Sequence, residues 1–544
     1  MRAGRARIAQ AWVLSLSLVA LQPCRASEDS KSIVDVRFDA PYRQIEISLG
    51  DEWAPTWGRD DVLYTGNDDG TSFGGVENNA IAFGKLEGSN PYSLKGTTIN
   101  GMEDFREPLI FGPEAARWQT LETYSIEGVR YRFIACDADA SHSGSSCLAS
   151  STDDGKNWRR ITAPAKSLSR AARFGAPSFI AQGQLESLFG GKLGEYAFAS
   201  SYAGVVAGRD NYLIGRVKKE KLPDSDLADW TFQQANGSWG PLETAAQFPN
   251  TSYLGPDGAN WKITNTYSVD GVLYMFVTRC VYPRQSSDPN HRHVWQNASV
   301  VKSTDLGKTW TRSAADNYAK PMFPDKRFGT PYFVWYGKDG AATVDNADKY
   351  VYAVSNDGYF ENGDNYVLGR VLRSKLPKLA AADWSFFRAG DGMQESSWTP
   401  TLETAVPVLA NPGRASMTGM TYIEGLRRYI MVVWHYHRDN FDQAIKAKDL
   451  GTVLEFFEAP KPWGPWNKVK AFDTGRLGWY TPIVGQRFQT AVNSTAVSVF
   501  LYATGFQTKP EGGLDFALYK LNYMPITLST TLLKHKDLAF VGSK

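Results

Sequence analysis

The chain of 544 residues has little cysteine and histidine, 4 and 6 residues, and it has no long run of charges of one sign. Its formal net charge of +2 gives no basic footprint of the kind that nucleic-acid-binding proteins present. No Cys/His spacing matches a zinc site, and neither a phosphate-binding glycine loop nor a Gly-x-Ser-x-Gly elbow occurs. We expect no cofactor, with calcium at the acidic loops around Asp68 or Asp139 left open.

Apolar runs long enough to cross a bilayer, about 20 residues, are also missing. The apolar run Ala11 to Leu21 follows three arginines in residues 2–7 and precedes the small residue Ala26. This order is typical of a secretory signal peptide. The sequence therefore predicts cleavage after residue 26 and a secreted or periplasmic protein with no membrane span, which we expect to be a monomer.

Three cysteines follow the predicted signal peptide: Cys136, Cys147 and Cys280. Export permits disulfides. Cys136 and Cys147 bracket a Gly/Ser-rich loop, so we expect these two to pair and Cys280 to remain unpaired. The alternative is that all three are buried thiols.

Aromatic residues are abundant, at 13% of the chain, with 17 Trp and 26 Tyr. Together with 42% hydrophobic residues, this composition excludes a disordered chain. Flat aromatic faces suit sugar rings, although most aromatic residues in any protein belong to its core.

Long segments of the chain recur. Three strings return 154 residues later, namely Arg173-Phe-Gly-Ala-Pro-Ser-Phe at 327, Asp210-Asn-Tyr-Leu-Ile-Gly-Arg-Val at 364 and Asp229-Trp-Thr-Phe at 383. Just upstream, Thr123-Tyr-Ser-Ile-Glu-Gly-Val returns 143 residues later at 266. Four collinear matches indicate a duplicated segment.

A shorter repeat, a pattern of strands joined by turns, recurs along the whole chain, and few segments have helical periodicity. Acidic-Gly or acidic-acidic turns between alternating apolar runs indicate hairpins, and seven such units recur. Regular four-stranded units predict an all-β fold, a β-propeller of seven blades, with five or six blades as the alternatives. We expect an N-terminal segment over 27–44, one propeller domain over 45–528 and a tail over 529–544. A five-bladed ancestor with two duplicated blades would explain the repeat.

Two turns share the pattern Ser-x-Asp-x-Gly-x-x-Trp: Ser151 to Trp158 and Ser303 to Trp310. This pattern resembles the Asp-box of sialidase-type propellers. The aspartates, Asp153 and Asp305, are expected to fold back on the turn backbone and to act structurally.

Several strings occur in the order known from one protein family. They are Gly50-Asp-Glu-Trp-Ala-Pro-Thr-Trp, Asn67-Asp-Asp-Gly, Arg327-Phe-Gly-Thr-Pro, Tyr422-Ile-Glu-Gly-Leu-Arg-Arg-Tyr and Glu458-Ala-Pro-Lys-Pro-Trp-Gly-Pro-Trp. Over most of residues 45–505 the chain resembles secreted bacterial propeller proteins that include the endo-D-arabinanases. The resemblance implies a glycoside hydrolase with aspartate catalysis and points to Asp51 and Asp69. Those enzymes are described as five-bladed, so the extra blade pair is a departure from the family.

The first hairpin places the same two aspartates together on geometric grounds. Asp51 lies nine residues before the turn near Asp60, and Asp69 lies nine residues after it. Adjacent strands would bring the two carboxylates within roughly 5 to 9 Å, which covers retaining and inverting glycosidases. The acid of the pair needs a raised pKa, supplied by its partner or by burial against Trp53 or Trp57.

Counting residues from the turns of the other units in the same way predicts which residues lie at the same end of the propeller channel as Asp51 and Asp69. Strand starts give Trp118, Arg173, Trp261, Arg327, Arg414 and Trp479, and second-strand ends give Asp137, Tyr202, Arg279, Asn356, His435 and His437. Glu122 is added because its duplicate is Asn265. We take Trp53, Trp118, Glu122, Arg173, Tyr202, Trp261, Arg327, Arg414, His435 and Trp479 as candidates for binding a carbohydrate substrate.

Two other functions remain open. Clustered Arg173, Arg327 and Arg414 would suit a sialidase-like hydrolase or a lyase on anionic glycans, with Tyr202 or His435 as nucleophile or base. A binding propeller without catalysis is the third hypothesis, and it predicts that Asp51→Asn leaves sugar binding intact.

Overall fold

The computed structural model describes residues 31–75, 79–101, 124–126, 129–135, 146–153, 157, 159–161, 177–180, 195–206, 209–249, 260–281, 294–313, 321–508 and 514–533. The predicted signal peptide lies outside these residues. The described chain is almost entirely β, as the sequence predicts, and its single α-helix is α3 (Phe441–Lys446). Within these ranges no helix has the length and apolar character that a membrane span requires.

The strands form seven antiparallel sheets, numbered here in chain order. Sheet 1 contains β3 (Ser48–Asp51), β4 (Thr56–Trp57), β5 (Leu63–Phe73), β6 (Asn79–Glu87) and β7 (Lys95–Asn100). Sheet 2 contains β8 (Tyr124–Ile126), β9 (Val129–Ala135), β10 (Ser146–Ser151) and β11 (Arg159–Arg160). Sheet 3 contains β12 (Pro177–Ile180), β13 (Tyr196–Val206), β14 (Arg209–Lys218), β15 (Thr231–Gln233), β16 (Trp239–Gly240) and β17 (Phe248–Pro249).

The remaining four sheets follow in the C-terminal part of the chain. Sheet 4 contains β18 (Asn260–Val269), β19 (Val272–Val281), β20 (Val294–Ser303) and β21 (Thr311–Arg312). Sheet 5 contains β22 (Thr330–Phe333), β23 (Tyr350–Asn356), β24 (Gly363–Leu372), β25 (Trp384–Phe387), β26 (Trp398–Thr399) and β27 (Leu409–Ala415). Sheet 6 contains β28 (Met420–Ile423), β29 (Arg428–Tyr436), β30 (Thr452–Ala459) and β31 (Asn467–Asp473). Sheet 7 contains β32 (Leu477–Asn493), β33 (Ala496–Thr508), β34 (Leu514–Asp515) and β35 (Asn522–Ser529), joined by β1 (Asp35–Phe38) and β2 (Arg43–Gln44).

Five of the seven sheets contact one another in a closed circuit, in the order 1, 4, 5, 6, 7 and back to 1. The connecting hydrogen bonds run from Ile263 N to Asp68 Oδ1 (3.0 Å), Phe333 N to Asn265 Oδ1 (3.0 Å), Trp335 N to Met420 O (3.0 Å), Thr421 Oγ1 to Val484 O (2.8 Å) and Tyr480 Oη to Asp51 Oδ2 (3.0 Å). An isolated parallel bridge joins Trp335 to Thr421, as expected where first strands of neighbouring blades run side by side. Among the described residues these five sheets are therefore arranged as a ring, as the blades of a propeller are.

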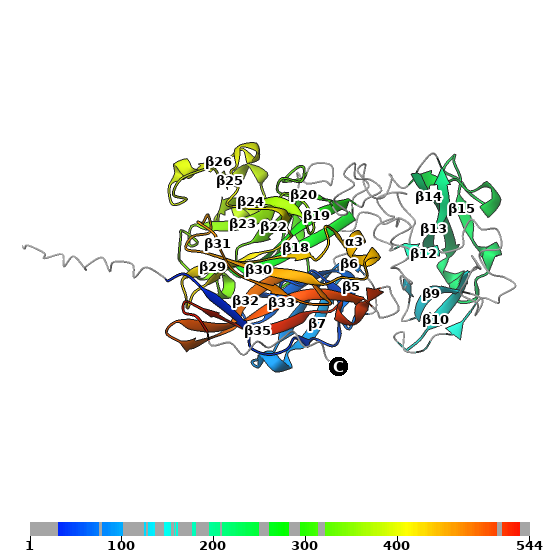
Figure 1. The fold of residues 1–544 in the computed structure, drawn as a ribbon. Coiled ribbons are helices and arrows are strands. Elements are labelled where there is room, and N and C mark those ends of the chain that lie inside the picture. The colour runs from blue at the N-terminus through cyan, green and yellow to red at the C-terminus, as the bar shows by residue number, and fades with distance from the viewer. Residues whose placement is uncertain are drawn as a thin grey trace, which may run out of the picture.

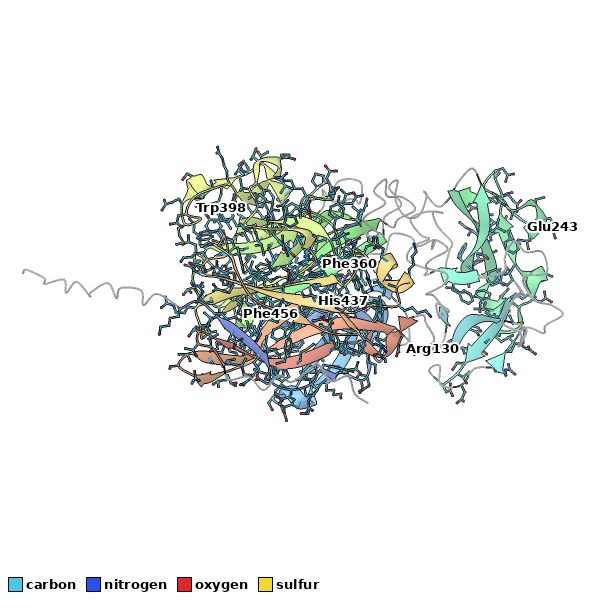
Figure 2. The ribbon with its side chains drawn as sticks, in the orientation of Figure 1. Arg130, Glu243, Phe360, Trp398, His437 and Phe456 are labelled. Carbon is cyan, nitrogen blue, oxygen red and sulfur yellow. The ribbon has the colours of Figure 1, made fainter. Side chains whose placement is uncertain are left out.

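Sheets 2 and 3, called here the inserted pair, stand outside this circuit. Their buried residues form a hydrophobic cluster of their own, separate from the clusters of the ring. Figure 1 shows β9, β10 and β12–β15 grouped to one side of the ring, and Figure 2 places Arg130 and Glu243 in that group and His437 in the ring. Seven strand units are present, but a seven-bladed ring is not confirmed, because repeat spacing counts sheets without saying which of them are neighbours.

The N-terminal segment, expected to precede the propeller, supplies the outer edge of its last blade. β1 pairs antiparallel with β35, with Asp35 opposite Ser529 and Phe38 opposite Ile526. The first and last parts of the chain thus share one sheet, so the ring is closed by backbone hydrogen bonds and the edge of β35 is covered.

The turn between β18 and β19 follows the predicted chemistry. Asp270 and Gly271 join β18 to β19 with φ values of 55° and 76°, and Val269 lies opposite Val272. Two successive positive φ values are typical of a type I′ turn, whose twist matches that of the strands. Short 3-10 helices make other connections: Pro91–Ser93, Lys219–Asp224, Leu227–Asp229, Leu242–Thr244, Lys338–Gly340, Leu376–Lys378, Ala381–Asp383, Glu395–Ser397, Leu402–Thr404 and Phe516–Leu518.

The two turns with the Ser-x-Asp pattern have the same hydrogen bonds. Asp305 Oδ1 accepts from Ser303 Oγ (2.8 Å) and from the backbone N of Thr309 (2.9 Å). Asp153 accepts equivalent bonds from Ser151 and from the backbone N of Asn157. These bonds lower the pKa of both carboxyls to about 2, and both side chains serve their own turns.

Two cysteines fall within described residues. Cys280 is a buried free thiol on β19, and Cys147 is buried on β10. Cys136 lies outside the described residues, so its pairing with Cys147 stays a prediction.

Candidate active site

The candidate site begins where β3 meets β5 in sheet 1. Asp51 ends β3, and its Cα partner on β5 is Asp68. Asp69 is the next residue along β5. The residue opposite Asp51 is therefore Asp68, one position before the Asp69 that counting from the turn predicts. The cause is an irregularity in the register between Leu49 and Asp51, which hairpin counting from the turn does not include.

Gly50 makes the irregular pairing possible. Its φ of 134° is rarely adopted by residues with a side chain. A Cβ at this position would lie 2.4 Å from Asn67 Nδ2 and 2.7 Å from the carbonyl oxygen of Asp68. The glycine therefore permits the close approach that brings Asp51 beside Asp68.

Asp51 accepts hydrogen bonds from two tyrosines, Tyr480 on β32 and Tyr519 in the connection that precedes β35. Tyr480 Oη donates to Asp51 Oδ2 at 3.0 Å, and the hydroxyl of Tyr519 is the second partner. Phe506 lies between these tyrosines, stacked on Tyr480 at 5.2 Å and on Tyr519 at 5.2 Å between ring centroids. This stack fixes where both hydroxyls point.

The pKa of Asp51 is raised to about 7. Withdrawal of the carboxyl from water is the largest cause, and the negative charge of Asp69 is the second. The positive charge of Lys262 and the two tyrosine hydrogen bonds act in the opposite direction without cancelling the effect. A large part of Asp51 is therefore protonated at neutral pH.

Asp69 is held by a cation instead. Its Oδ2 forms an ion pair with Lys262 Nζ on β18, the first strand of sheet 4. The side chain of Lys262 is only 4% exposed, whereas that of Asp69 is 45% exposed. Asp69 thus presents a paired carboxylate to solvent beside the protonated Asp51.

Two further carboxyls lie behind this pair, Glu52 and Asp68, 3% and 1% exposed. Asp68 accepts from the backbone N of Ile263 at 3.0 and 3.3 Å, and its carboxyl hydrogen-bonds to that of Glu52. Burial raises the pKa of both groups well above their usual range, and neighbouring carboxylates add to the effect. Two buried carboxyls in hydrogen-bond contact share a proton.

The backbone at these residues is strained. Glu52 and Asp69 have positive φ values of 57° and 45°, and neither is glycine. Such conformations cost roughly 1–3 kcal/mol each and cluster at functional sites. In this hairpin the strain coincides with the four carboxyls.

The arrangement provides a proton donor next to an anionic oxygen. A protonated carboxyl beside an ionised one is the combination that glycosidases use to protonate a leaving group and stabilise or attack the sugar cation. In the described ranges no group of three or more His, Cys, Asp or Glu side chains is placed to hold a metal ion.

Two of the aromatic residues predicted to bind substrate, Trp53 and Trp479, are buried in the core. Trp53 and Trp479 are 1% and 0% exposed, so neither offers a face to a sugar. Trp53 instead donates from Nε1 to the carbonyl of Gly50 (2.8 Å), and Trp479 packs edge-on against Tyr42. Both are core residues that support the strands of the site.

Three members of the predicted arginine and histidine cluster, Arg327, Arg414 and His435, have partners other than the four acids in the part of the chain that the structure describes. Arg327 donates to the carbonyl oxygen of Ala405 (2.7 Å), within sheet 5 and its connections. Arg414 and His435 both face Glu455 on β30, at 3.7 and 3.8 Å. Burial alone would raise the pKa of Glu455, but hydrogen bonds from His435, Lys468 and Asn411 outweigh burial and lower the pKa to about 2. Arg414 and Lys468 therefore neutralise a buried carboxylate of sheet 6.

The other candidates cannot be placed. Trp118, Glu122, Arg173 and Asp137 lie outside the described residues, as do the side chains of Tyr202 and Trp261, whose backbones belong to β13 and β18. Asn265, the duplicate of Glu122, is buried and exchanges hydrogen bonds with the backbone of Phe333 (3.0 and 3.1 Å). Asn265 therefore joins sheets 4 and 5.

Sequence reasoning missed Lys262, Tyr480, Tyr519 and the acidic role of Glu52. It also missed Tyr332, a buried tyrosine in the field of Glu52, Asp68 and Asp51 whose hydroxyl has no partner among the described residues. A signal for two of these exists in the duplication, because Gln119 and Ser178 stand where the second copy has Lys262 and Tyr332.

Comparison with protein-family models finds no match, and neither does comparison with curated protein sequences. Among solved structures, the α-L-arabinofuranosidase Arb93A of Fusarium graminearum aligns over 92% of this chain and 97% of its own, with 12% identity and a TM-score of 0.24. The α-L-arabinanase of Penicillium chrysogenum aligns over 92% and 98%, with 10% identity and a TM-score of 0.25. A Trypanosoma rangeli sialidase variant with trans-sialidase activity aligns over 91% of this chain and 59% of its own, with 12% identity and a TM-score of 0.24. Likeness at this level carries no inference about fold or function.

Proposed function

We propose that the chain is a glycoside hydrolase that acts on a neutral poly- or oligosaccharide at the mouth of the ring. Asp51 is the general acid, and Asp69 is the nucleophile or the general base. The observation that carries the proposal is the pairing of a carboxyl withdrawn from water with a solvent-facing carboxylate that Lys262 neutralises. Action outside the cytoplasm is part of the proposal and rests on the predicted signal peptide.

The charge of the site favours neutral substrates. Four carboxyls, those of Asp51, Glu52, Asp68 and Asp69, share the cation Lys262. An anionic sugar would need an arginine cluster here. Of the three predicted arginines, Arg327 and Arg414 have partners in sheets 5 and 6, and Arg173 lies outside the described residues. The sialidase-like alternative therefore has less support than a neutral glycan.

The test is release of reducing ends by the purified full chain across a panel of neutral and uronic glycans that includes arabinan. Asp51→Asn and Asp69→Asn are expected to lower kcat about 10²–10⁴-fold, the usual contribution of a positioned acid or base. Asp60→Asn is the matched control. Asp60 belongs to the same hairpin but bonds Tyr64 Oη (2.7 Å) at the opposite end, so its loss should leave turnover near that of the wild type.

The anomer that is released first separates the two roles of Asp69. Retention of configuration indicates a nucleophile that forms a covalent glycosyl-enzyme, and inversion indicates a general base that activates water. Turnover that survives both asparagine changes with unchanged Tm would contradict the assignment. Binding without turnover on any glycan would favour the non-catalytic alternative.

A further inference from the structure

Lys262 is an unusual residue for the inside of a sheet. It lies on β18 opposite Thr278, and its side chain is 4% exposed. Lysine is almost never fully buried unless it is paired. Its partner is the carboxylate of Asp69, which belongs to a different sheet of the ring.

The charge of Lys262 reaches every acid of the site. It favours the ionised forms of Asp51, Glu52 and Asp68, in addition to its direct contact with Asp69. One ammonium group therefore acts on all four carboxyls, but it touches the most exposed of them.

The duplicated copy of this strand offers an independent observation. Trp118 and Tyr124 correspond to Trp261 and Tyr267, but Gln119 stands in place of Lys262. Tyr267 is buried and packs against Phe333 at 5.6 Å. The aromatic residues are therefore the same in both copies, whereas the residue that contacts the acids is a lysine only in the ring.

We propose that Lys262 is a positioning residue whose buried ammonium group holds the carboxylate of Asp69 by an ion pair and orients it beside Asp51. This inference rests on the proposed function. Two adjacent carboxyls without a nearby cation share one proton, and either can carry it. The ammonium group at Asp69 makes the pair asymmetric, so that the acid and the nucleophile or base have fixed identities.

Lys262→Gln, which introduces the residue of the duplicate copy, tests the proposal together with Lys262→Arg. The readout is the pH dependence of kcat/KM in the full chain. Lys262→Gln should move the alkaline limb, which reports the ionisation of Asp51, to higher pH, because the charge of Lys262 lowers the pKa of that carboxyl. The same change should lower the maximum at least about 10-fold. Lys262→Arg should return the limb toward its wild-type position.

Lys470→Gln is the matched control. Lys470 Nζ pairs with the buried carboxylate of Asp35 at 3.0 Å, in sheets 6 and 7 and outside the site. This variant should lower Tm without moving either limb of the profile. If Lys262→Gln lowers turnover and leaves both limbs in place, Lys262 is only structural and the proposal is wrong.

A measurement without substrate separates this proposal from the proposed function. If the wild type turns over no glycan, the proposed function fails, but the pH dependence of Tm still tests Lys262. Without the ammonium group the acids hold their protons to higher pH in the folded state, so Lys262→Gln should lose Tm more steeply than the wild type between pH 5 and 8. Lys262→Arg should follow the wild type. Parallel curves for all three proteins would overturn the role of Lys262.

Discussion

The inserted pair, sheets 2 and 3, and its duplicate in the ring, sheets 4 and 5, were built from the same repeat and are used differently. Sheets 3 and 5 have the same strand order, with β17 on β14 in one and β27 on β24 in the other. Each pair also has the same arginine between two aromatic rings, Arg216 in the insert and Arg370 in the ring. The repeat therefore carries the fold of a blade pair wherever it is placed.

What differs is the neighbour of the first strand. In the ring, β18 lies against β5, and Ile263 and Lys262 reach Asp68 and Asp69. The inserted pair lies outside that circuit and has a hydrophobic cluster of its own. A blade supplies packing by itself, but the candidate site exists only where two particular sheets meet.

The largest expected effect is a loss of stability that distinguishes the hydrophobic core of the inserted pair from that of the ring. Phe179 and Phe333 occupy corresponding positions in the two copies and are 2% and 0% exposed. Truncation of either to alanine should cost about 3–5 kcal/mol, since each leaves a cavity in a packed core. Calorimetry should show two unfolding transitions, with Phe179→Ala lowering one and Phe333→Ala the other.

Enzyme activity gives a second test of this comparison. At temperatures below the unfolding transition that it lowers, Phe179→Ala should have the same turnover as the wild type. A single transition that both substitutions lower equally would show that the two pairs unfold as one unit. The ring of five sheets would then need revision.

The second-largest expected effect is a pH dependence of Tm that only the unfolding transition of the ring shows. The pKa values of Asp51, Glu52 and Asp68 are raised in the folded state, so their contribution to stability is complete below pH 4 and is lost as pH rises toward the folded values. Between pH 4 and 7 the Tm of the ring transition should fall by several degrees, since one unit of pKa shift corresponds to about 1.4 kcal/mol. The triple change Asp51→Asn, Glu52→Gln, Asp68→Asn should remove this slope, and a ring transition that rises over this range would contradict the assignment.

The smallest effect should be the same in both pairs. Asp153 and Asp305 stabilise equivalent exposed turns, and their pKa values are lowered to about 2. Their contribution is present above pH 4 and is lost as pH falls toward 2. Asp153→Ala and Asp305→Ala should each lower the Tm of their own pair by less than about 2 °C at pH 7. A loss of turnover in Asp305→Ala with unchanged Tm would show that this aspartate has a role beyond its turn.

Much of the fold could be predicted from the sequence, because strands and hairpin turns leave local patterns. Asp270-Gly271 predicts a hairpin and forms one. The neighbours of each sheet could not be predicted, because contacts such as Trp335 to Met420 depend on the closure of the whole ring. The pairing of β1 with β35 was missed for the same reason, since its partner lies at the other end of the chain.

The relative position of Asp51 and Asp69 was predictable to within one register position. Asp51 and Asp69 were identified correctly as neighbours of one hairpin, but the irregular register at Gly50 places Asp68 opposite Asp51. Lys262 follows Trp261 in an ordinary strand pattern, and nothing local distinguishes it from a solvent-facing lysine. Counting residues from the hairpin turns also selected Arg414 and His435, but both contact Glu455. Such counting predicts the position of a residue along its strand and not the direction of its side chain.

The central claim is that Asp51 acts as a proton donor at neutral pH. The most direct test is the pH dependence of kcat/KM for the full chain on the best glycan of the panel. A general acid with a pKa of about 7 requires an alkaline limb near pH 7, above which the rate falls tenfold per unit. A rate that stays constant from pH 7 to pH 9 would contradict the account, because Asp51 would then be ionised throughout and unable to donate a proton.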